Sequence, residues 1–223
     1  MILMDLHAAT SWTKLEEFDK KGFFVIKNVY NAEALADTIP NERGMFTYSK
    51  NLDFGSKKGN SNIRIQLDPD EGQVSGSVAR YNHPKYRQAH THIRREIEKH
   101  IGRDLFNTYY YDRFYFPGQK LKRHRDRDAC EISISLHIGT NLEEPYLFYI
   151  QALDDEKVYG LELGPGDGIV YKGCQSWHWR DEMPGHKGLF SRFNKQMLYY
   201  HQIFLHYVLA DGIRSHCAGD ANS

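Results

Sequence analysis

The stretch YFPGQKLKRHRD, residues 115–126, contains the pattern on which the expected fold and site depend. An aromatic pair and a Pro-Gly turn precede a short run that ends with His124 and Asp126. On an extended strand, residues two apart leave the same face, so the imidazole and the carboxylate can point toward one ion. A His-x-Asp spacing is common by itself, however, and its meaning depends on a third ligand and on the surrounding strands.

A third ligand is available in the stretch GPGDGIVYKGCQSWHWR, residues 164–180. A Gly/Pro turn, a short apolar run and a second turn lead to His178, which stands between two tryptophans. Two imidazoles and one carboxylate form the facial set that non-haem iron(II) oxygenases use, with positions left open for other ligands. We therefore expect His124, Asp126 and His178 to hold one metal ion.

The second half of the chain carries aromatic and β-branched runs separated by Gly and Pro, a pattern typical of antiparallel strands. The aromatic content of 13% agrees with a strand-rich chain. We expect a β-rich core from residue 105 to 210, within a single domain that spans residues 1–223. The expected strands cover residues 109–116, 131–138, 146–151, 158–163, 168–171 and 197–208.

The N-terminal part, residues 1–104, shows helix signals and is expected to form a helical support and lid region. A capping-box pattern, an Asn cap and a Pro at a first helical position each mark the start of a helix. We expect helices to begin after Thr13, after Asn31 and at Pro84, with a buried strand at residues 23–26.

Charge and cysteine content exclude several classes of protein. Lys plus Arg equals Asp plus Glu at 29 each, so no global field attracts nucleic acid or an anionic membrane. Cys130, Cys174 and Cys217 include no CxxC pair, which argues against a disulfide framework and a cysteine zinc site. The sequence also shows neither a signal peptide nor a segment apolar for long enough to cross a bilayer. We expect a cytoplasmic protein without a nucleic-acid or membrane partner.

Residues 115–126 resemble the Tyr-x-x-Gly-Gln-x-x-x-x-His-x-Asp motif of the 2-oxoglutarate/Fe(II)-dependent dioxygenase superfamily, in its prolyl 4-hydroxylase-like branch. Three further stretches are similar to the same family: EISISLHIGTN after the metal pair, LELGPGDGIVYKG before the distal histidine, and GFFVIKNVYNAEAL near the N-terminus. The resemblance implies a mainly β fold with flanking helices, the double-stranded β-helix or jelly roll.

The resemblance also implies which residues bind the cofactors. Fe(II) would be held by the three ligands named above, and 2-oxoglutarate would chelate it while its far carboxylate needs a buried hydroxyl and a cation. Tyr115 supplies the hydroxyl by its place in the motif. For the cation, Lys187 fits the family spacing, nine positions after the distal histidine, but the following sequence departs from the pattern. Lys195 and Arg180 therefore stay open as alternatives.

The activity implied by the resemblance is hydroxylation of a substrate with consumption of O2 and release of succinate and CO2. The substrate could be a peptidyl proline, a free amino acid, another small metabolite or a nucleobase. We expect the polar stretch 41–76 and the loop 186–194 to select it. An isomerase of the cupin type, or a non-catalytic metal-binding barrel, is the alternative, and release of succinate distinguishes the two possibilities.

Overall fold

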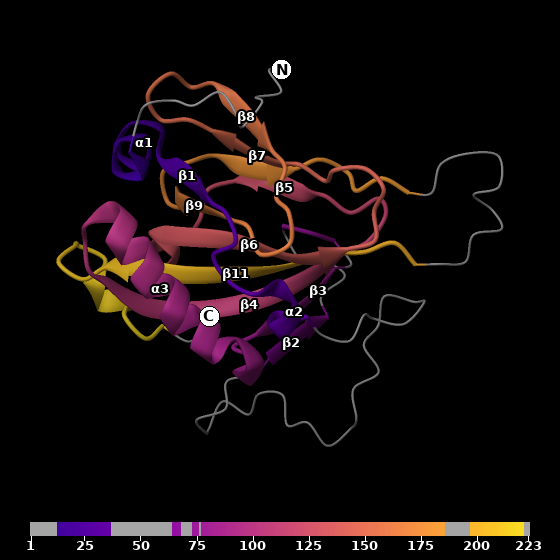
Figure 1. Cartoon of the computed structure of the whole chain (residues 1–223), viewed down its shortest axis with the longest axis horizontal. Helices are drawn as coiled ribbons and strands as arrows, with labels where there is room; N and C mark the ends of the chain where they lie inside the picture. The colour runs from indigo at the N-terminus through magenta and orange to yellow at the C-terminus, as the bar shows by residue number, and fades with distance from the viewer. Residues whose placement is uncertain (1–12, 37–63, 68–72, 76, 186–196, 221–223) are drawn as a thin grey trace.

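A computed structural model describes residues 13–36, 64–67, 73–75, 77–185 and 197–220, which form two antiparallel sheets (Figure 1). The larger, the major sheet, has the strand order β1-β9-β6-β11-β4-β3-β2, and the minor sheet has the order β5-β10-β7-β8. The strands of the major sheet are β1 Phe23–Ile26, β2 Arg64–Leu67, β3 Val78–Tyr81, β4 Leu105–Tyr115, β6 Ile132–Thr140, β9 Gly168–Lys172 and β11 Tyr200–Leu209. Those of the minor sheet are β5 Leu121–His124, β7 Phe148–Gln151, β8 Val158–Leu161 and β10 His178–Arg180.

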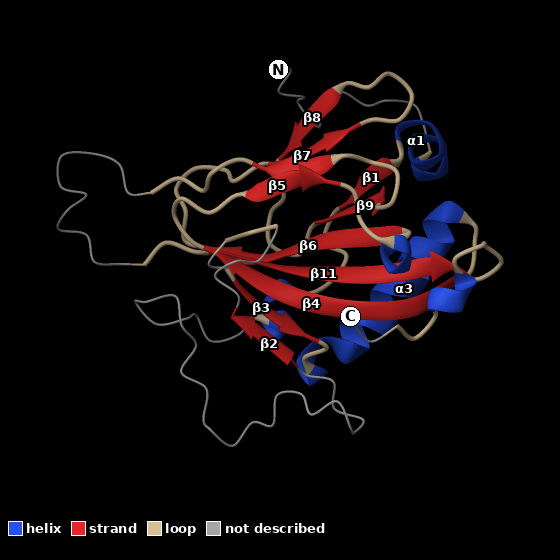
Figure 2. Cartoon of the chain, turned by 180° about the vertical axis from the view of Figure 1, so that it is seen from behind, coloured by secondary structure: helices blue, strands red, loops and turns tan. Residues whose placement is uncertain are grey.

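The described helices are α1 Lys14–Lys21, α2 Ala32–Leu35 and α3 Arg87–Ile101, with short 3-10 turns η1 Pro84–Tyr86, η2 Asp128–Cys130 and η4 Ser215–Cys217. The labelled helices α1 and α3 lie at the same side of the molecule (Figure 2). The capping box of Thr13 and Glu16 is formed, and Asn31 caps α2. Pro84 begins a 3-10 turn rather than the α-helix, which starts three residues later at Arg87. Among the described helices none is long and apolar enough to cross a membrane.

Two sheets that face each other in this way form the double-stranded β-helix, so the expected fold class is confirmed. The part before residue 105, expected to be a helical support and lid region, also contributes strands to the sheets. Strands β1, β2 and β3 all come from the N-terminal part and complete the two ends of the major sheet. Short edge strands of this kind carry a weak sequence signal, and β3 is defined mainly by its pairing with β4.

The outer face of the major sheet is covered by α3, which lies across β4 and β11 (Figure 1). The buried face of this helix presents Ile93, Ile97 and Ile101 to apolar side chains of the sheet. Burial of each such side chain contributes roughly 1.5 to 3 kcal/mol, so this layer supplies much of the stability. The sheet residues in this cluster include Ile132, Ile134, Leu136, Val170, Ile203, Leu205 and Tyr207.

The inner face of the major sheet is different, because alternate residues of the same strands are polar. On β6, Ser133 and Ser135 alternate with the isoleucines, and on β11, Gln202 and His206 alternate with apolar residues. All four are buried between the sheets. The interior of the barrel is therefore apolar near β7 and β8 but polar along β6 and β11, which is where a polar ligand can be accommodated.

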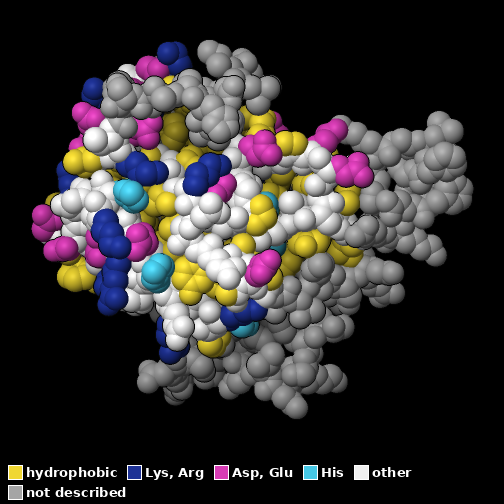
Figure 3. Space-filling model, viewed as in Figure 1, with side chains coloured by type: hydrophobic (Ala, Val, Ile, Leu, Met, Phe, Trp, Pro, Cys, Tyr) yellow, Lys and Arg dark blue, Asp and Glu magenta, His cyan; other side chains and the backbone are white. Residues whose placement is uncertain are grey.

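Charged side chains remain on the surface in a mixed pattern. Figure 3 shows basic and acidic groups interspersed over the described part of one face, as the balanced charge of the sequence indicates. This face offers no large field of one sign to attract a polyelectrolyte.

His90 is the polar exception on the buried face of α3. Its side chain is 3% exposed, and its ring lies against those of Tyr110 and Tyr207. Its Nε2 lies 3.0 Å from the carbonyl oxygen of His206, to which it donates. Burial lowers the pKa of His90 from 6.5 to about 4, although the bond to this carbonyl opposes the shift. The ring is thus neutral in the folded protein over a range of pH where the unfolded chain is protonated.

This difference predicts an acid-sensitive stability. Between pH 6.5 and about 4 the unfolded chain binds a proton at His90 that the folded chain does not, so the free energy of unfolding should fall as the pH is lowered. The loss is about 1.4 kcal/mol per pH unit for each such group. The variant His90→Gln keeps a donor for the carbonyl of His206 but cannot be protonated. The free energy of unfolding should therefore depend less steeply on pH, by the contribution of one histidine. Guanidinium unfolding at several pH values measures it, with the exposed His92→Gln as control; an unchanged slope in His90→Gln would contradict the assignment.

Candidate metal centre

His124 and His178 lie opposite each other on two neighbouring strands. β5 and β10 pair antiparallel with His178 in register with His124, and their ring centroids are 4.3 Å apart. Asp126 follows the end of β5, where its backbone N–H donates to the carbonyl of Gly173 at 2.9 Å. Its Oδ1 lies 3.4 Å from Nε2 of His124 and 3.4 Å from Nε2 of His178. The three residues expected to bind a metal are therefore brought together.

Each imidazole is held by its other ring nitrogen. Nδ1 of His124 lies 2.8 Å from the carbonyl oxygen of Lys122, and Nδ1 of His178 lies 3.0 Å from that of Ser176. A carbonyl only accepts, so Nδ1 carries the proton, and in a neutral imidazole Nε2 then presents a lone pair. Two lone pairs and a carboxylate oxygen converge at one place, an arrangement that repels itself unless a cation lies between them.

Asp126 is ionised in this environment. Burial disfavours its charge, but without a metal ion a protonated His178 or His124 would donate from Nε2 to Oδ1 and hold the pKa of the Asp126 carboxyl well below the usual value. His124 is the most exposed of the three side chains at 18%, compared with 9% for Asp126 and 1% for His178. The donor set is thus buried on one side and reachable on the other.

A second group of possible ligands, Asp126, Cys130 and His206, has ligand atoms within 4.8 Å of one another. Cys130 and His206 are both 2% exposed, so a metal ion held by this group would have little access to solvent or substrate. Burial also raises the pKa of the Cys130 thiol well above its usual value, and the thiol contacts the hydroxyl of Tyr109 at 3.2 Å. The set of two histidines and one carboxylate is the better metal site.

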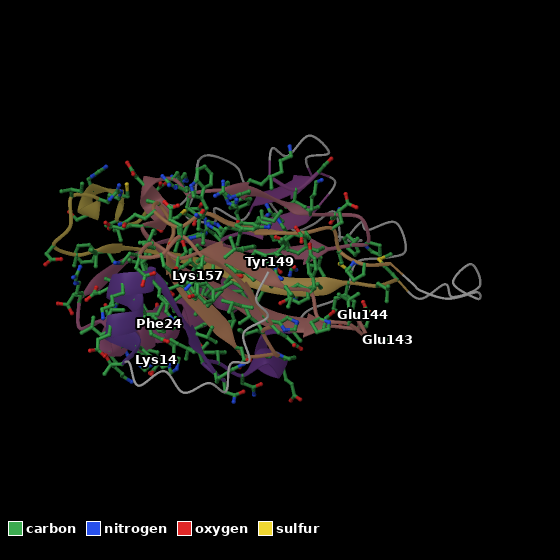
Figure 4. All side chains as sticks on the ribbon, turned by 90° about the horizontal axis from the view of Figure 1, so that it is seen from above. Lys14, Phe24, Glu143, Glu144, Tyr149 and Lys157 are labelled. Atoms are coloured by element: carbon green, nitrogen blue, oxygen red, sulfur yellow. The ribbon has the colours of Figure 1, made fainter. Side chains whose placement is uncertain are left out.

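The edge strand β5 is held against β10 by a row of stacked side chains on the outer face of the minor sheet. The guanidinium of Arg123 lies 4.4 Å from the ring of Trp177 and 5.6 Å from that of Trp179, while Arg125 lies 4.6 Å from Trp177. Trp179 in turn stacks on Tyr149, which is labelled in the view from above (Figure 4). The two tryptophans therefore back the histidine-bearing strands instead of covering the metal ligands.

The position two residues beyond His178 is occupied by a deeply buried cation, Arg180. Its side chain is 1% exposed, and the guanidinium lies among the rings of Tyr115, Tyr146 and Tyr200. It donates to the carbonyl oxygen of Tyr146 and, at 3.2 Å, to the hydroxyl of Tyr200. Within the described part of the chain no carboxylate pairs with it, and its Nε has no hydrogen-bond partner.

Tyr115 faces the same space with an unused hydroxyl. It is fully buried, and its hydroxyl has no hydrogen-bond partner among the residues that the structure describes. Burial raises the pKa of Tyr200 despite the nearby guanidinium of Arg180, so this phenol stays protonated and able to donate, whereas the hydroxyl of Tyr146 already donates to the carbonyl oxygen of Asp181 at 3.0 Å. A buried cation and unused donors at one place are what an anionic ligand requires.

The other two candidate cations, Lys187 and Lys195, lie outside the described residues, as do the loop 186–194 and most of the stretch 41–76. Arg113, two residues before Tyr115 on β4, is fully buried, and its guanidinium lies 5.9 Å from the Tyr115 ring.

The fold is that of the 2-oxoglutarate and Fe(II) oxygenases, prolyl 4-hydroxylases included, as the motif resemblance predicts. A 2OG-Fe(II) oxygenase-family oxidoreductase from Burkholderia pseudomallei aligns with 100% of this chain and 99% of its own, with a TM-score of 0.62 and 10% identity.

Two further solved structures share this fold. A prolyl 4-hydroxylase from Pseudomonas putida has a TM-score of 0.52 at 13% identity and covers 86% of this chain and 96% of its own. HygX from Streptomyces hygroscopicus, solved with nickel, 2-oxoglutarate and hygromycin B, has a TM-score of 0.53 at 10% identity and covers 86% of each chain. No family profile and no curated protein sequence matches the chain.

Sequence reasoning missed several residues of this site. Tyr146 and Tyr200 line the space around Arg180, and Ser133 contacts Asp126, yet none belongs to a short motif. A weak signal was present, because Tyr200 opens the last predicted strand and Ser133 occurs at alternate spacing in EISISLHIG.

The converging lone pairs predict a divalent metal site that stabilises the fold. With free metal at one hundred times its dissociation constant, the gain is about 2.7 kcal/mol, or about 5 to 10 °C in the unfolding temperature. His124→Ala should abolish this shift, because one of three donors is lost, whereas His92→Ala on the exposed side of α3 should retain it. Thermal unfolding with and without Ni(II) provides the measurement, and an equal shift in His124→Ala and wild type would refute the site.

Proposed function

We propose that this protein is an Fe(II)- and 2-oxoglutarate-dependent oxygenase that hydroxylates a small molecule or a peptide. The observation that carries the proposal is the pairing of two features inside one barrel. The lone pairs of His124, Asp126 and His178 converge on one point, and a buried guanidinium without a carboxylate partner in the described residues lies two positions along β10 from His178. Metal alone explains the first feature and an anionic co-substrate explains the second.

In this proposal His124, Asp126 and His178 hold the Fe(II) ion. Iron with bound 2-oxoglutarate supplies the redox chemistry, in which O2 is reduced while the co-substrate is converted to succinate and CO2. With only three protein donors, coordination positions remain for other ligands. The fixed Nδ1 contacts of both imidazoles keep their Nε2 atoms aimed at the ion, which limits reorganisation when ligands exchange.

The inner pocket would bind the far carboxylate of 2-oxoglutarate. Arg180 offers charge through its free Nε, and Tyr115 offers a hydroxyl that has no other partner among the described residues. Tyr200 accepts from Arg180, so its own proton is available to the same carboxylate. Of the three cations that the sequence left open, Arg180 is the one that this reading favours, because its burial is already established and its charge needs an anion.

The substrate would enter from the exposed side of His124, since the opposite side of the metal set is closed by buried residues. Tyr109 and Tyr111 lie on β4 next to His206, with the ring of Tyr81 stacked on both. Of these three rings that of Tyr81 is partly exposed and can contact a substrate, which suits an apolar or ring-shaped group. A peptidyl proline, an amino acid or another small metabolite satisfies that description.

Turnover tests the proposed activity directly. The purified protein, supplied with Fe(II), 2-oxoglutarate and O2, should release succinate and add one oxygen atom to a member of a substrate mixture, as mass spectrometry detects. Asp126→Ala should lose both products because it removes the only ligating carboxylate. Metal binding without succinate release in the presence of substrates would favour the non-catalytic barrel, and a rearranged substrate without succinate would favour an isomerase.

The assignment of the co-substrate cation yields a separate prediction. A buried carboxylate that loses its charged partner typically loses about 3 to 5 kcal/mol, which is several hundredfold or more in affinity. Arg180→Gln should therefore raise the KM for 2-oxoglutarate by that order while the Ni(II)-induced rise in unfolding temperature is retained. Lys187→Leu and the surface variant Arg95→Leu, at an exposed position of α3, serve as comparisons and should keep a KM near the wild-type value. If only Lys187→Leu raises the KM, the family spacing identifies the cation and Arg180 does not.

A further inference from the structure

The two oxygens of Asp126 have different partners. Oδ1 faces both imidazoles at 3.4 Å, whereas Oδ2 accepts a hydrogen bond from the hydroxyl of Ser133 at 3.1 Å. Ser133 lies on the inner face of β6 with its side chain fully buried. One carboxylate oxygen is thus turned toward the metal position, and the other is bound by the barrel wall.

The direction of the hydrogen bonds follows from the acceptors that Ser133 faces. Its one hydroxyl proton can be donated to Oδ2 of Asp126 at 3.1 Å or to the carbonyl oxygen of Cys130 at 3.2 Å, and the charged carboxylate is the stronger acceptor. Nδ1 of His206 lies 2.9 Å from the same hydroxyl and must then donate its own proton to the Ser133 oxygen. His206 is 2% exposed and its ring rests against that of Tyr109, 4.7 Å away, so this donor is fixed in place. A chain of two bonds leads from His206 through Ser133 to Asp126.

Gly173 closes the remaining side of the carboxylate. A Cβ at this position would lie 2.5 Å from Oδ2 of Asp126, 2.9 Å from the hydroxyl of Ser133 and 2.2 Å from the carbonyl oxygen of Cys130. The absence of a side chain lets the backbone approach, and the carbonyl of Gly173 accepts from the N–H of Asp126 at 2.9 Å. Backbone and carboxylate of Asp126 are therefore both anchored by contacts that do not involve the other two ligands.

We propose that Ser133, oriented by His206 and enclosed by Gly173, is the positioning residue that keeps Asp126 a one-oxygen ligand. The inference rests on the proposed metal site and extends it to a residue that contacts no metal. Without the hydrogen bond from Ser133, the carboxylate of Asp126 could turn both oxygens to the ion. It would then occupy a coordination position that the co-substrate requires. The hydrogen bond from Ser133 also orders the Asp126 side chain before the metal binds. Its loss should therefore lower the affinity for the metal.

The test compares two serines on the same strand. In metal-free protein titrated with Co(II) by calorimetry, Ser133→Ala should raise the dissociation constant about 10- to 100-fold, the usual cost of a lost outer contact. Ser135→Ala is the matched control: Ser135 lies two residues along on the same buried face and accepts from Gln202 at 3.0 Å, without contact to a metal ligand. It should bind Co(II) as the wild type does.

A second readout separates positioning from loss of folding. The visible absorption of bound Co(II), which reports coordination geometry, should change in Ser133→Ala and be retained in Ser135→Ala and in Ser133→Thr, which keeps the hydroxyl. His206→Phe should give a smaller change in the same direction. Equal Co(II) affinity and spectrum in Ser133→Ala and wild type would overturn the role of Ser133 alone. Absence of Co(II) binding by the wild-type protein would instead overturn the metal site and the proposed function.

Discussion

The arrangement of this protein depends on bringing three electron-pair donors to one point inside a β-barrel. Such donors repel one another without a cation, so the surrounding structure must hold them in place before any ion binds. Backbone pairing of β5 with β10 sets His124 opposite His178, and the carbonyl of Gly173 fixes Asp126 just beyond the strand end. Strand β5 is short and lies at the sheet edge, so few backbone hydrogen bonds hold it. The contacts of Arg123 and Arg125 with Trp177 add cross-strand stabilisation.

The same barrel must also tolerate a buried positive charge. Moving a guanidinium out of water costs several kcal/mol unless hydrogen bonds and an opposite charge compensate. Arg180 receives hydrogen-bond acceptors from Tyr146 and Tyr200 and the faces of several aromatic rings, but no carboxylate from the described residues. The folded protein thus keeps an electrostatic deficit at this point, and an anionic ligand would remove it. An anion bound beside Arg180 would therefore gain affinity from a charged hydrogen bond that the guanidinium does not make within the described residues.

Much of the fold and the metal site could be predicted from local sequence, because the relevant signals are short. Strand periodicity places His124 and Asp126 on one face, and helix caps at Thr13 and Asn31 depend on neighbours within three residues. The cation could not be chosen in the same way, since local sequence does not show which of the three candidates, Arg180, Lys187 and Lys195, is buried. Of these the structure describes Arg180, which is buried. Strands β2 and β3 were also beyond local reasoning, because the pairing of β3 with β4 and of β2 with β3 defines them more than their own composition does.

The outer face of the major sheet contributes mainly to stability, and its inner face carries the polar residues near the metal site. Its outer face packs isoleucines against α3 and gains free energy from burial, whereas its inner face buries Ser133, Gln202 and His206, which gain little unless hydrogen-bonded. A strand can serve both purposes because side chains alternate between faces with a period of two. One consequence is that a single-residue slip of β6 would place isoleucine beside Asp126 and serine beneath the helix, losing the core and the site together. Two sets of contacts therefore determine the register of β6: the apolar packing against α3 on the outer face and the hydrogen bonds of the polar residues on the inner face. A change of register would disrupt both sets.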